Sequence, residues 1–451
     1  MKLIYNVKDK PKAGQLIVFA IQQLLAIMAA TLVVPVITGH NMSSVAALFG
    51  AGCGTLIYLA FTKMRSPVFL GSSFAFLGSM AAAFAGGVSM QLGYLGLILG
   101  AIFAGLVYVI IALIVKIAGV NWINKLMPTV VIGPTVSIIG LSLAGNAIGD
   151  LGKGGTGMTP STYVTLICGL VTLFVVCISS VYGKKIGKLI PFIIGIGAGY
   201  LTATIFTVIG TFTENASLIV INFAPFSQLF ADGVKLSSFV SVPDFTFLTA
   251  IDGFKEINPS YVISILIAYV PVAFVVFAEH IADHKNISTI IEKDLLEDPG
   301  LSRTLLGDGV GSMVGAIFGG CPNTTYGESV GCVAITKNAS IYTILTAALM
   351  AILVSFISPF VALVNTIPSC VMGGVCMALY GFIAVSGLKM IQKVDLEDNR
   401  NLFVVSVILI AGIGGLTLSF GDITITKIAC ALILGIIVNK VVNLKKTNAA
   451  E

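Results

Sequence analysis

The chain has 451 residues, of which 57% are hydrophobic and only 10% are charged, and its mean hydropathy is +1.03. Soluble domains carry about 25% charged residues, so this composition excludes a soluble fold and indicates an integral membrane protein. The net charge of +5 requires no nucleic-acid partner, because lysines in the loops between apolar runs account for it.

Apolar runs of about 20 residues, the length that crosses roughly 30 Å of hydrocarbon, recur along the whole chain. They predict about fourteen transmembrane helices, at residues 14–38, 44–62, 68–85, 92–117, 127–144, 164–181, 189–209, 261–280, 305–318, 327–341, 342–364, 370–390, 402–420 and 423–442. The first run is too long for the apolar part of a signal peptide, so we expect it to remain as the first helix. The longest gap, residues 211–259, is itself half apolar and too short for a soluble enzyme domain.

Lysines and arginines gather in alternate gaps between these runs. They precede residue 14 and recur at residues 63–65, 116–125, 184–188, 285–303, 389–400 and 440–446. The positive-inside rule then places both termini in the cytoplasm, which agrees with an even number of spans. We expect a multi-pass protein of the cytoplasmic (plasma) membrane, with the lipid bilayer as its surroundings.

Metal, redox and hydrolytic chemistry have no motif in this chain. The eight cysteines lack CxxC spacing and lie mostly in apolar runs, which is typical of small core residues. Three histidines are too few for a haem or a multi-metal site, and there is no HExxH, GxSxG or cluster of His and Asp. We therefore expect no enzyme, no catalytic residues, no metal and no cofactor.

Two glutamates stand out as carboxylates within or beside apolar runs. Such a placement costs about 2.5–3.5 kcal/mol on insertion scales. Glu279 lies in VPVAFVVFAEHIADH, and Asp283 follows it by four residues, so both carboxylates share one helix face while His280 points elsewhere. Glu328 lies in PNTTYGES, residues 322–329. The alternatives are a helix that ends in interfacial water at Glu279 and a surface hairpin at PNTTYGES.

Two segments join proline, glycine and hydroxyl residues to apolar runs: PNTTYGES and SPVFLGSSFAF, residues 66–76. Irregular backbone at membrane depth is tolerated where it lines a cavity, so such a pair indicates a binding site. Gly327 follows Phe74 by 253 positions, and Glu279 follows Gln22 by 257. This near-constant offset predicts an internal repeat.

Gln22 and Gln23 are the amide counterparts of Glu279 in the first span. They could reach the same cavity. The alternative, of equal weight, is that they form hydrogen bonds between helices.

The polar groups of this site suit a planar ligand that has both hydrogen-bond donors and acceptors. Carboxylates accept N–H bonds, while free backbone N–H groups near Phe74 and Gly327 donate to carbonyl oxygens. Arg65, Arg303 and Arg400 all lie in gaps, so an anion would lack its usual partner and a neutral substrate is favoured. A carboxylate away from water can bind a proton, which offers coupling to the proton gradient; sodium coupling stays open.

The motifs VVFAEHIADH, GDGVGSMVGAIFGGCPNTTYGESVGCVAITK, LGSSFAF and QQLLAIMAATLVVPV resemble the nucleobase–cation symporter-2, or nucleobase–ascorbate transporter, family over residues 14–442. Within it the PNTTYGE and AEH motifs resemble the uracil permease branch, because xanthine and urate members carry a QN-type motif instead. The resemblance implies an all-α protein of fourteen spans in two inverted repeats of seven, with two short strands near residues 73–76 and 325–327. It also implies uracil uptake with protons.

The resemblance further implies roles for particular residues. Glu279 and Glu328 would hydrogen-bond the base, and the backbone at Phe74 and Gly327 would meet its carbonyl oxygens. We add Ser73 to this set. The residues that we expect to support the site are Gln22, Gln23, Asn323, Thr325 and Tyr326.

The candidates for proton coupling are Glu279, Asp283 and His280. Some relatives have a histidine at the position of Asp283, which is a departure in this chain. We expect a core domain of residues 14–145 and 260–364 and a gate domain of residues 146–259 and 365–445, with a possible homodimer through the gate. The alternatives are a permease for another nucleobase, such as xanthine or guanine, and an anion transporter of the same architecture.

Overall fold

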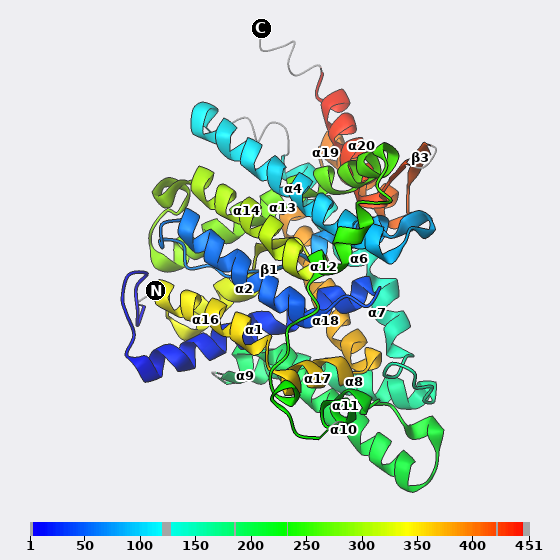
Figure 1. The fold of residues 1–451 in the computed structure, drawn as a ribbon. Coiled ribbons are helices and arrows are strands. Elements are labelled where there is room, and N and C mark those ends of the chain that lie inside the picture. Colours follow the sequence, from blue (N-terminus) through cyan, green and yellow to red (C-terminus); the bar gives the residue numbers. More distant parts are fainter. Residues whose placement is uncertain (1–2, 120–127, 185, 232, 421–422, 445–451) are drawn as a thin grey trace.

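The computed structural model describes residues 3–119, 128–184, 186–231, 233–420 and 423–444, and most of them form helices (Figure 1). Eight helical stretches of this part are long and apolar enough to cross a membrane: α1 (Ala13–Thr38), α2 (Ser44–Phe61), α4 (Met90–Ala118), α6 (Thr129–Ser142) continued by α7 (Ala144–Leu151), α8 (Thr162–Tyr182), α10 (Pro191–Phe212), α13 (Pro259–Ile291) and α18 (Ser369–Ile391). The chain is therefore a multi-pass helical membrane protein.

Shorter helices complete the described part of the chain. They are α3 (Leu77–Ala83), α9 (Ile186–Leu189), α11 (Ala224–Leu229), α12 (Thr246–Gly253), α14 (Leu301–Gly319), α15 (Gly327–Thr336), α16 (Ile341–Val354), α17 (Ser358–Thr366), α19 (Asn399–Ile413) and α20 (Lys427–Val442). A 3-10 turn, Phe74–Phe76, precedes α3 directly. Some predicted features lie outside the described residues. They are residue 127 of the predicted span 127–144 and, in the predicted positive loops, Lys2, Lys125, Lys185 and residues 445–446.

Several predicted spans differ from the observed helices. Predicted span 342–364 is two helices, α16 and α17. Predicted span 402–420 is helical only to Ile413, because Gly415 adopts φ 78 and turns the chain away from the helix axis. An unpredicted antiparallel hairpin of β3 (Leu418–Phe420) and β4 (Ile423–Ile425) follows it.

Helix α13 corrects the prediction that its span ends at His280, because it continues to Ile291. His280 and His284 are both 0% exposed, so neighbouring helices cover them. The alternative in which the helix ends in interfacial water at Glu279 is therefore wrong.

Two short strands meet where the apolar helices are broken. Strand β1 (Leu70–Ser72) pairs antiparallel with β2 (Asn323–Thr325), and Gly71 lies opposite Thr324. The strands thus precede the positions near residues 73–76 and 325–327 that the resemblance implied. Both strands are buried, so PNTTYGES is not a surface hairpin.

The close crossing of these strands depends on Gly71. A Cβ at this position would lie 2.4 Å from two ring carbons of Tyr326, and only glycine lacks that atom. The hydroxyl of Tyr326 donates to the carbonyl of Ser72 at 2.6 Å. The ring therefore fixes the two strands to each other.

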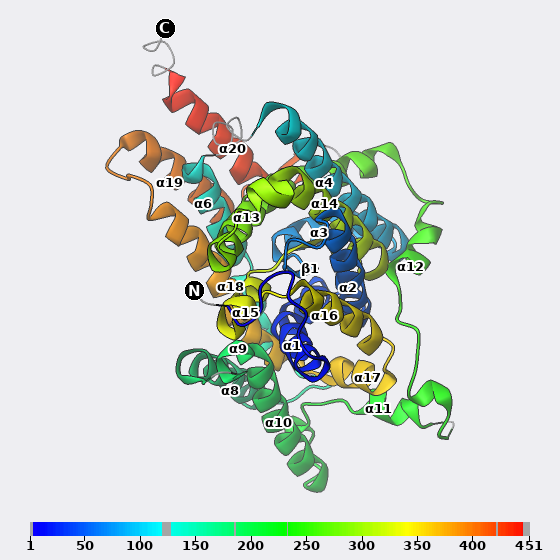
Figure 2. The ribbon, with the colours of Figure 1, turned by 90° about the vertical axis from the view of Figure 1, so that its left-hand side faces the viewer.

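The same order of elements occurs on both sides of the strand pair. Two helices, a strand and two helices appear as α1, α2, β1, α3 and α4, and again as α13, α14, β2, α15 and α16. The paired residues Gly71 and Thr324 are 253 positions apart, since 324 − 71 = 253. Helix α2 packs against α14 and α1 packs against α16, and Figure 2 shows α2, α3, α14 and α16 around β1.

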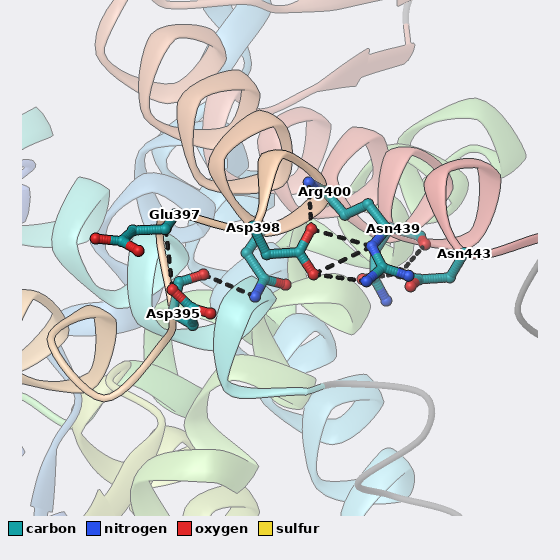
Figure 3. Close-up of polar contacts among 7 residues, drawn as sticks. Asp395, Glu397, Asp398, Arg400, Asn439 and Asn443 are labelled. Carbon is teal, nitrogen blue, oxygen red and sulfur yellow. Dashed lines mark hydrogen bonds and ion pairs between the residues drawn. The ribbon is translucent and has the colours of Figure 1, made fainter.

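The remaining long helices pack mainly with one another. Helix α18 packs against α6, α7 and α8, while α19 packs against α6 and α20. In the connection between α18 and α19, Asp398 accepts from the backbone N–H of Arg400 at 3.0 Å and from its guanidinium Nη2 at 2.7 Å (Figure 3). The Asp398 carboxylate thus satisfies a free N–H group at the start of α19.

Candidate functional site

A cavity of about 470 Å³ lies beside the ends of the two crossing strands. One wall consists of the backbone and side chains around the start of α3 and α15 and of one face of α13. The opposite wall comes from α6, α10 and α18 and is mostly apolar. The first wall consists of Ser73, Phe74, Ala75, Ala278, Glu279, Ala282, Asp283, Asn286, Thr324, Thr325, Tyr326, Gly327 and Glu328.

Two helix N-termini end at this cavity. The 3-10 turn before α3 begins at Phe74 and α15 begins at Gly327. The first backbone N–H groups of a helix have no carbonyl partner within it, and neither Ser73 nor Tyr326 supplies a side-chain cap. Each broken helix therefore presents free N–H donors and the positive end of its dipole to the cavity.

Three carboxylates face the same space. Glu279 and Asp283 lie one turn apart on α13, and Glu328 lies in the first turn of α15. Asp283 Oδ2 accepts a hydrogen bond from Thr325 Oγ1 at 2.9 Å. Among the described residues that line the cavity, there is no lysine or arginine. The cavity thus combines strong acceptors with backbone donors and lacks a basic side chain to hold an anion.

Most of the residues predicted for the site line this cavity. Ser73, Phe74, Gly327, Thr325 and Tyr326 lie there together with the carboxylates.

His280 lies on another face of α13, where its Nδ1 is 2.6 Å from Asp308 Oδ2 and its Nε2 is 3.0 Å from Thr304 Oγ1. Asn323 does not line the cavity either, because its amide donates to the carbonyl of Gly50 at 3.2 Å. It joins β2 to α2.

The two glutamines of α1 lie outside the cavity wall. The amide of Gln23 donates to Ser329 Oγ, and the backbone N–H of Phe69 donates to the same oxygen at 3.0 Å. Gln23 therefore links α1 to α15, as expected from the alternative in which the glutamines form hydrogen bonds between helices. Gln22 Oε1 is buried without a partner among the described residues.

Asp308 is a buried carboxylate that the sequence analysis missed. It lies on α14 in the segment LLGDGVGSMVGAIF and is 1% exposed. A single carboxylate within an apolar, glycine-rich span is the signal that could have identified it, by the same argument that selected Glu279. Its carboxylate pairs with His280 and not with a cavity group.

Phe74 separates the first cavity from a second one of about 770 Å³, because it lines both. The second cavity is lined by the other end of α13, including Asn258, Tyr261 and Ser264, and by Lys427 of α20. Ser264 and Glu279 are fifteen residues apart on this helix, which is about 22 Å along its axis. The Phe74 ring packs edge-on against Tyr380 of α18, with the ring centroids 6.2 Å apart.

Comparison with known proteins places this architecture in a family. Residues 14–420 match the model for xanthine and uracil permeases, described as "Permease family". The uracil permease of Bacillus caldolyticus is 38% identical, over 97% of this chain and 94% of that protein. The uracil permease of Bacillus subtilis (strain 168) is 37% identical over 100% of this chain and 98% of that protein. The uracil permease of Escherichia coli (strain K12) is 34% identical over 96% of this chain and 92% of that protein.

Solved structures share the fold at low sequence identity. The transmembrane domain of the cyanobacterial bicarbonate transporter BicA has a TM-score of 0.62 at 14% identity, covering 96% of this chain and 99% of that one. The murine anion transporter Slc26a9 in its inward-facing state has a TM-score of 0.65 at 12% identity. The match covers 98% of this chain and 70% of that one. These similarities show the arrangement of helices and nothing about the cargo.

Proposed function

Because this chain belongs to the permease family of nucleobase–ascorbate transporters, we propose that it imports uracil across the cytoplasmic membrane together with protons. The permease relatives named as uracil permeases, matched over nearly the full length of the chain, support the cargo. The cavity at the strand crossing is the site that we assign to uracil. In this proposal the protein is a transporter without cofactors, and the proton is the coupling ion.

One observation carries the proposal: the donors and acceptors of the cavity match those of uracil. Uracil is a planar ring with two N–H groups and two carbonyl oxygens. Glu279 and Glu328 supply acceptors for the two N–H groups, and the free backbone N–H groups at Phe74 and Gly327 supply donors for the carbonyls. The hydroxyl of Ser73 is buried without a hydrogen-bond partner among the described residues, which leaves it available to the base.

The composition of the cavity also decides between a neutral and an anionic cargo. The structures with the same fold include transporters described as carrying bicarbonate and other anions. In this chain an anion would meet three carboxylates and no lysine or arginine among the described lining residues. Unscreened like charges repel strongly in a medium of low dielectric constant, so a neutral nucleobase fits this site better than an anion.

The same carboxylates support the proposed proton coupling. Glu279, Asp283 and Glu328 line one cavity, where their like charges repel. A proton is the counter-charge that such a group can take up when no basic side chain is near. We assign proton binding to Glu279 and Asp283 at the cavity, with His280 behind them.

Alternating access is the transport mechanism that we propose. The core consists of α1 to α4 and α13 to α17, and the gate of the helices from α6 to α11 and from α18 to α20. Helix α12 lies in the range expected for the gate but packs against α4 and α14 of the core. This division places α6 with the gate, because α6 packs against α18 and α19. In this proposal the first boundary of the core, expected at residue 145, would fall in the segment before α6. Both cavities lie between these groups of helices, on either side of Phe74.

Two inverted repeats of seven spans, fourteen in all, complete this proposal. The recurrence of helix, helix, strand, helix, helix around an antiparallel strand pair supports it. We place both termini in the cytoplasm from the loop lysines. The exposed apolar side chains of α8 and α10, such as Phe174, Ile178 and Ile205, would face lipid or a second copy of the gate.

The test is uptake of radiolabelled uracil into proteoliposomes that hold the purified protein, with and without an inward proton gradient and with unlabelled xanthine as competitor. We expect gradient-driven uptake that xanthine does not block. Strong inhibition by xanthine would show that the site accepts another nucleobase. Absence of uracil uptake would refute the proposed cargo.

A further inference from the structure

A cluster of buried polar side chains lies on the face of α13 that points away from the cavity. His280 and His284 are 0% exposed and Asp308 is 1% exposed. None of these residues lines the uracil cavity. Burying several ionisable groups together is costly unless they are paired or serve a function, so the hydrogen bonds among them need an explanation.

The contacts of His280 fix how many protons it shares with Asp308. The hydroxyl of Thr304 donates to the carbonyl of Leu301 at 3.0 Å, so its proton is in use. The contact of 3.0 Å between His280 Nε2 and Thr304 Oγ1 therefore requires an N–H on Nε2. One further proton must lie between His280 Nδ1 and Asp308 Oδ2, which are 2.6 Å apart. Without this proton, the lone pairs of His280 Nδ1 and Asp308 Oδ2 would face each other. The His280–Asp308 pair therefore holds one shared proton.

His284 begins a second hydrogen-bonded chain. Its Nδ1 lies 2.7 Å from the carbonyl of His280, which can only accept, so Nδ1 carries a proton. Its Nε2 is 2.6 Å from the Tyr58 hydroxyl, which is also 2.6 Å from Ser66 Oγ.

The one phenol proton of Tyr58 can serve only one of these two contacts. With neutral His284 it points to Nε2, and with protonated His284 it points to Ser66. The chain can therefore pass one proton by reversing its direction. Its far end adjoins Arg65, which is partly exposed.

The Asp308–His280 pair also connects with the uracil cavity, through Thr325. In the antiparallel ladder Gly71 pairs with Thr324 and the N–H of Tyr326 donates to Phe69. The N–H of Thr325 therefore points away from β1. It lies near the Asp308 carboxylate, whose Oδ1 has no hydrogen-bond partner among the described residues. The hydroxyl of the same residue donates to Asp283 in the cavity. A change in the charge of Asp308 would thus act on the residue that holds Asp283.

We propose that Asp308, His280, His284, Tyr58 and Ser66 form a proton path between the uracil site and the loop after α2, in which the Asp308–His280 pair stores one proton. The inference rests on the proton coupling proposed above. The rings of His280 and His284 stack with centroids 4.0 Å apart, and transfer between them requires one ring to turn. The charged and titratable groups around Asp308 are His280, Glu279, Asp283, His284, Tyr58 and Tyr108.

The experiment uses proteoliposomes that contain the pH-sensitive dye pyranine and the full-length protein. Uracil is added with an inward proton gradient, and proton influx is measured beside the uptake of radiolabelled uracil. The variants are Asp308→Asn and Tyr58→Phe, which keep the shape of each side chain. The matched control is Tyr269→Phe, because Tyr269 is equally buried on α13 and its hydroxyl has no hydrogen-bond partner among the described residues.

Both variants should bind uracil and exchange internal for external uracil like the wild type, because these readouts need no net proton movement. Their rate of uracil-dependent proton influx should fall about 100-fold or more, the lower end of what positioned proton donors contribute. Tyr269→Phe should keep the wild-type influx. If Asp308→Asn cannot be isolated folded, Tyr58→Phe decides.

Unchanged proton influx in Tyr58→Phe, or loss of uracil exchange together with proton influx, would overturn the path. A wild-type protein that takes up uracil without moving protons would instead refute the proton coupling of the proposed function. The two failures are therefore distinguishable.

Discussion

Replacing Glu328 with glutamine is the sharpest test of the uracil site. Glu328 lies in the first turn of α15 beside the cavity. The change keeps the shape of the side chain but replaces one carboxylate oxygen with an NH₂ group. An N–H of uracil that met an acceptor in the wild type would then meet a weaker acceptor or a second donor.

The expected loss follows from the type of hydrogen bond. Hydrogen bonds to charged groups contribute about 1.5–3 kcal/mol, which corresponds to a Kd weakened about 10- to 150-fold. The Glu328 carboxylate accepts a hydrogen bond from its own backbone N–H, and the amide oxygen of glutamine can accept the same bond. The fold should therefore hardly change. The loss should therefore show in binding and not in the melting temperature.

Equilibrium binding of radiolabelled uracil to the purified protein measures this loss, and thermal unfolding without uracil measures stability. The matched control is Glu397→Gln. Glu397 is exposed in the loop before α19, and Figure 3 shows its carboxylate pointing away from Asp398 and Arg400. Glu328→Gln binding that equals the Glu397→Gln control would refute the role of Glu328. A lowered melting temperature with unchanged affinity would assign it to the structure instead.

Three further changes test the strand crossing and the proton sites. Gly71→Ala places a Cβ 2.4 Å from the Tyr326 ring and should cost about 1–3 kcal/mol of stability; an unchanged melting temperature would contradict the close packing. Tyr326→Phe leaves the Ser72 carbonyl without its partner at 2.6 Å and should cost about 1–3 kcal/mol, measured in the same way. Asp283→Asn keeps an oxygen for the hydroxyl of Thr325 and should retain uracil binding while altering the dependence of uptake on pH; an unaltered pH profile would remove Asp283 from proton coupling.

The sequence predicted which residues gather at the cavity better than it predicted the limits of the helices. The AEHIAD and PNTTYGES motifs identify Glu279 and Glu328, and one helical turn places Asp283 beside Glu279, because carboxylates in apolar runs are rare. The predicted end of α13 at His280 was wrong for a physical reason. His280 and His284 contact side chains of α14 and α2 instead of water, and polarity along one segment cannot distinguish these surroundings.

Tertiary packing explains what else was missed. Asp308 follows two leucines and a glycine, and its partner His280 is 28 positions away, so its pairing depends on how α14 packs on α13. Gln23 likewise finds its partner at Ser329, on a helix that only the fold brings near α1. The N–H groups at Phe74 and Gly327 become donors because the chain breaks there, and the position of each break depends on the strand pairing.

The electrostatics of the cavity favour the proposed transport of a neutral cargo together with a proton. The two helix N-termini supply partial positive charge, roughly half an elementary charge each, but three carboxylates face the same cavity. Uracil can satisfy hydrogen bonds but adds no charge, so a fully ionised site would stay negative when the core moves through the bilayer. A bound proton removes one of these charges. In the proposed symport, moving this proton against its gradient would cost energy, so the direction of the proton gradient would set the direction of net uracil movement.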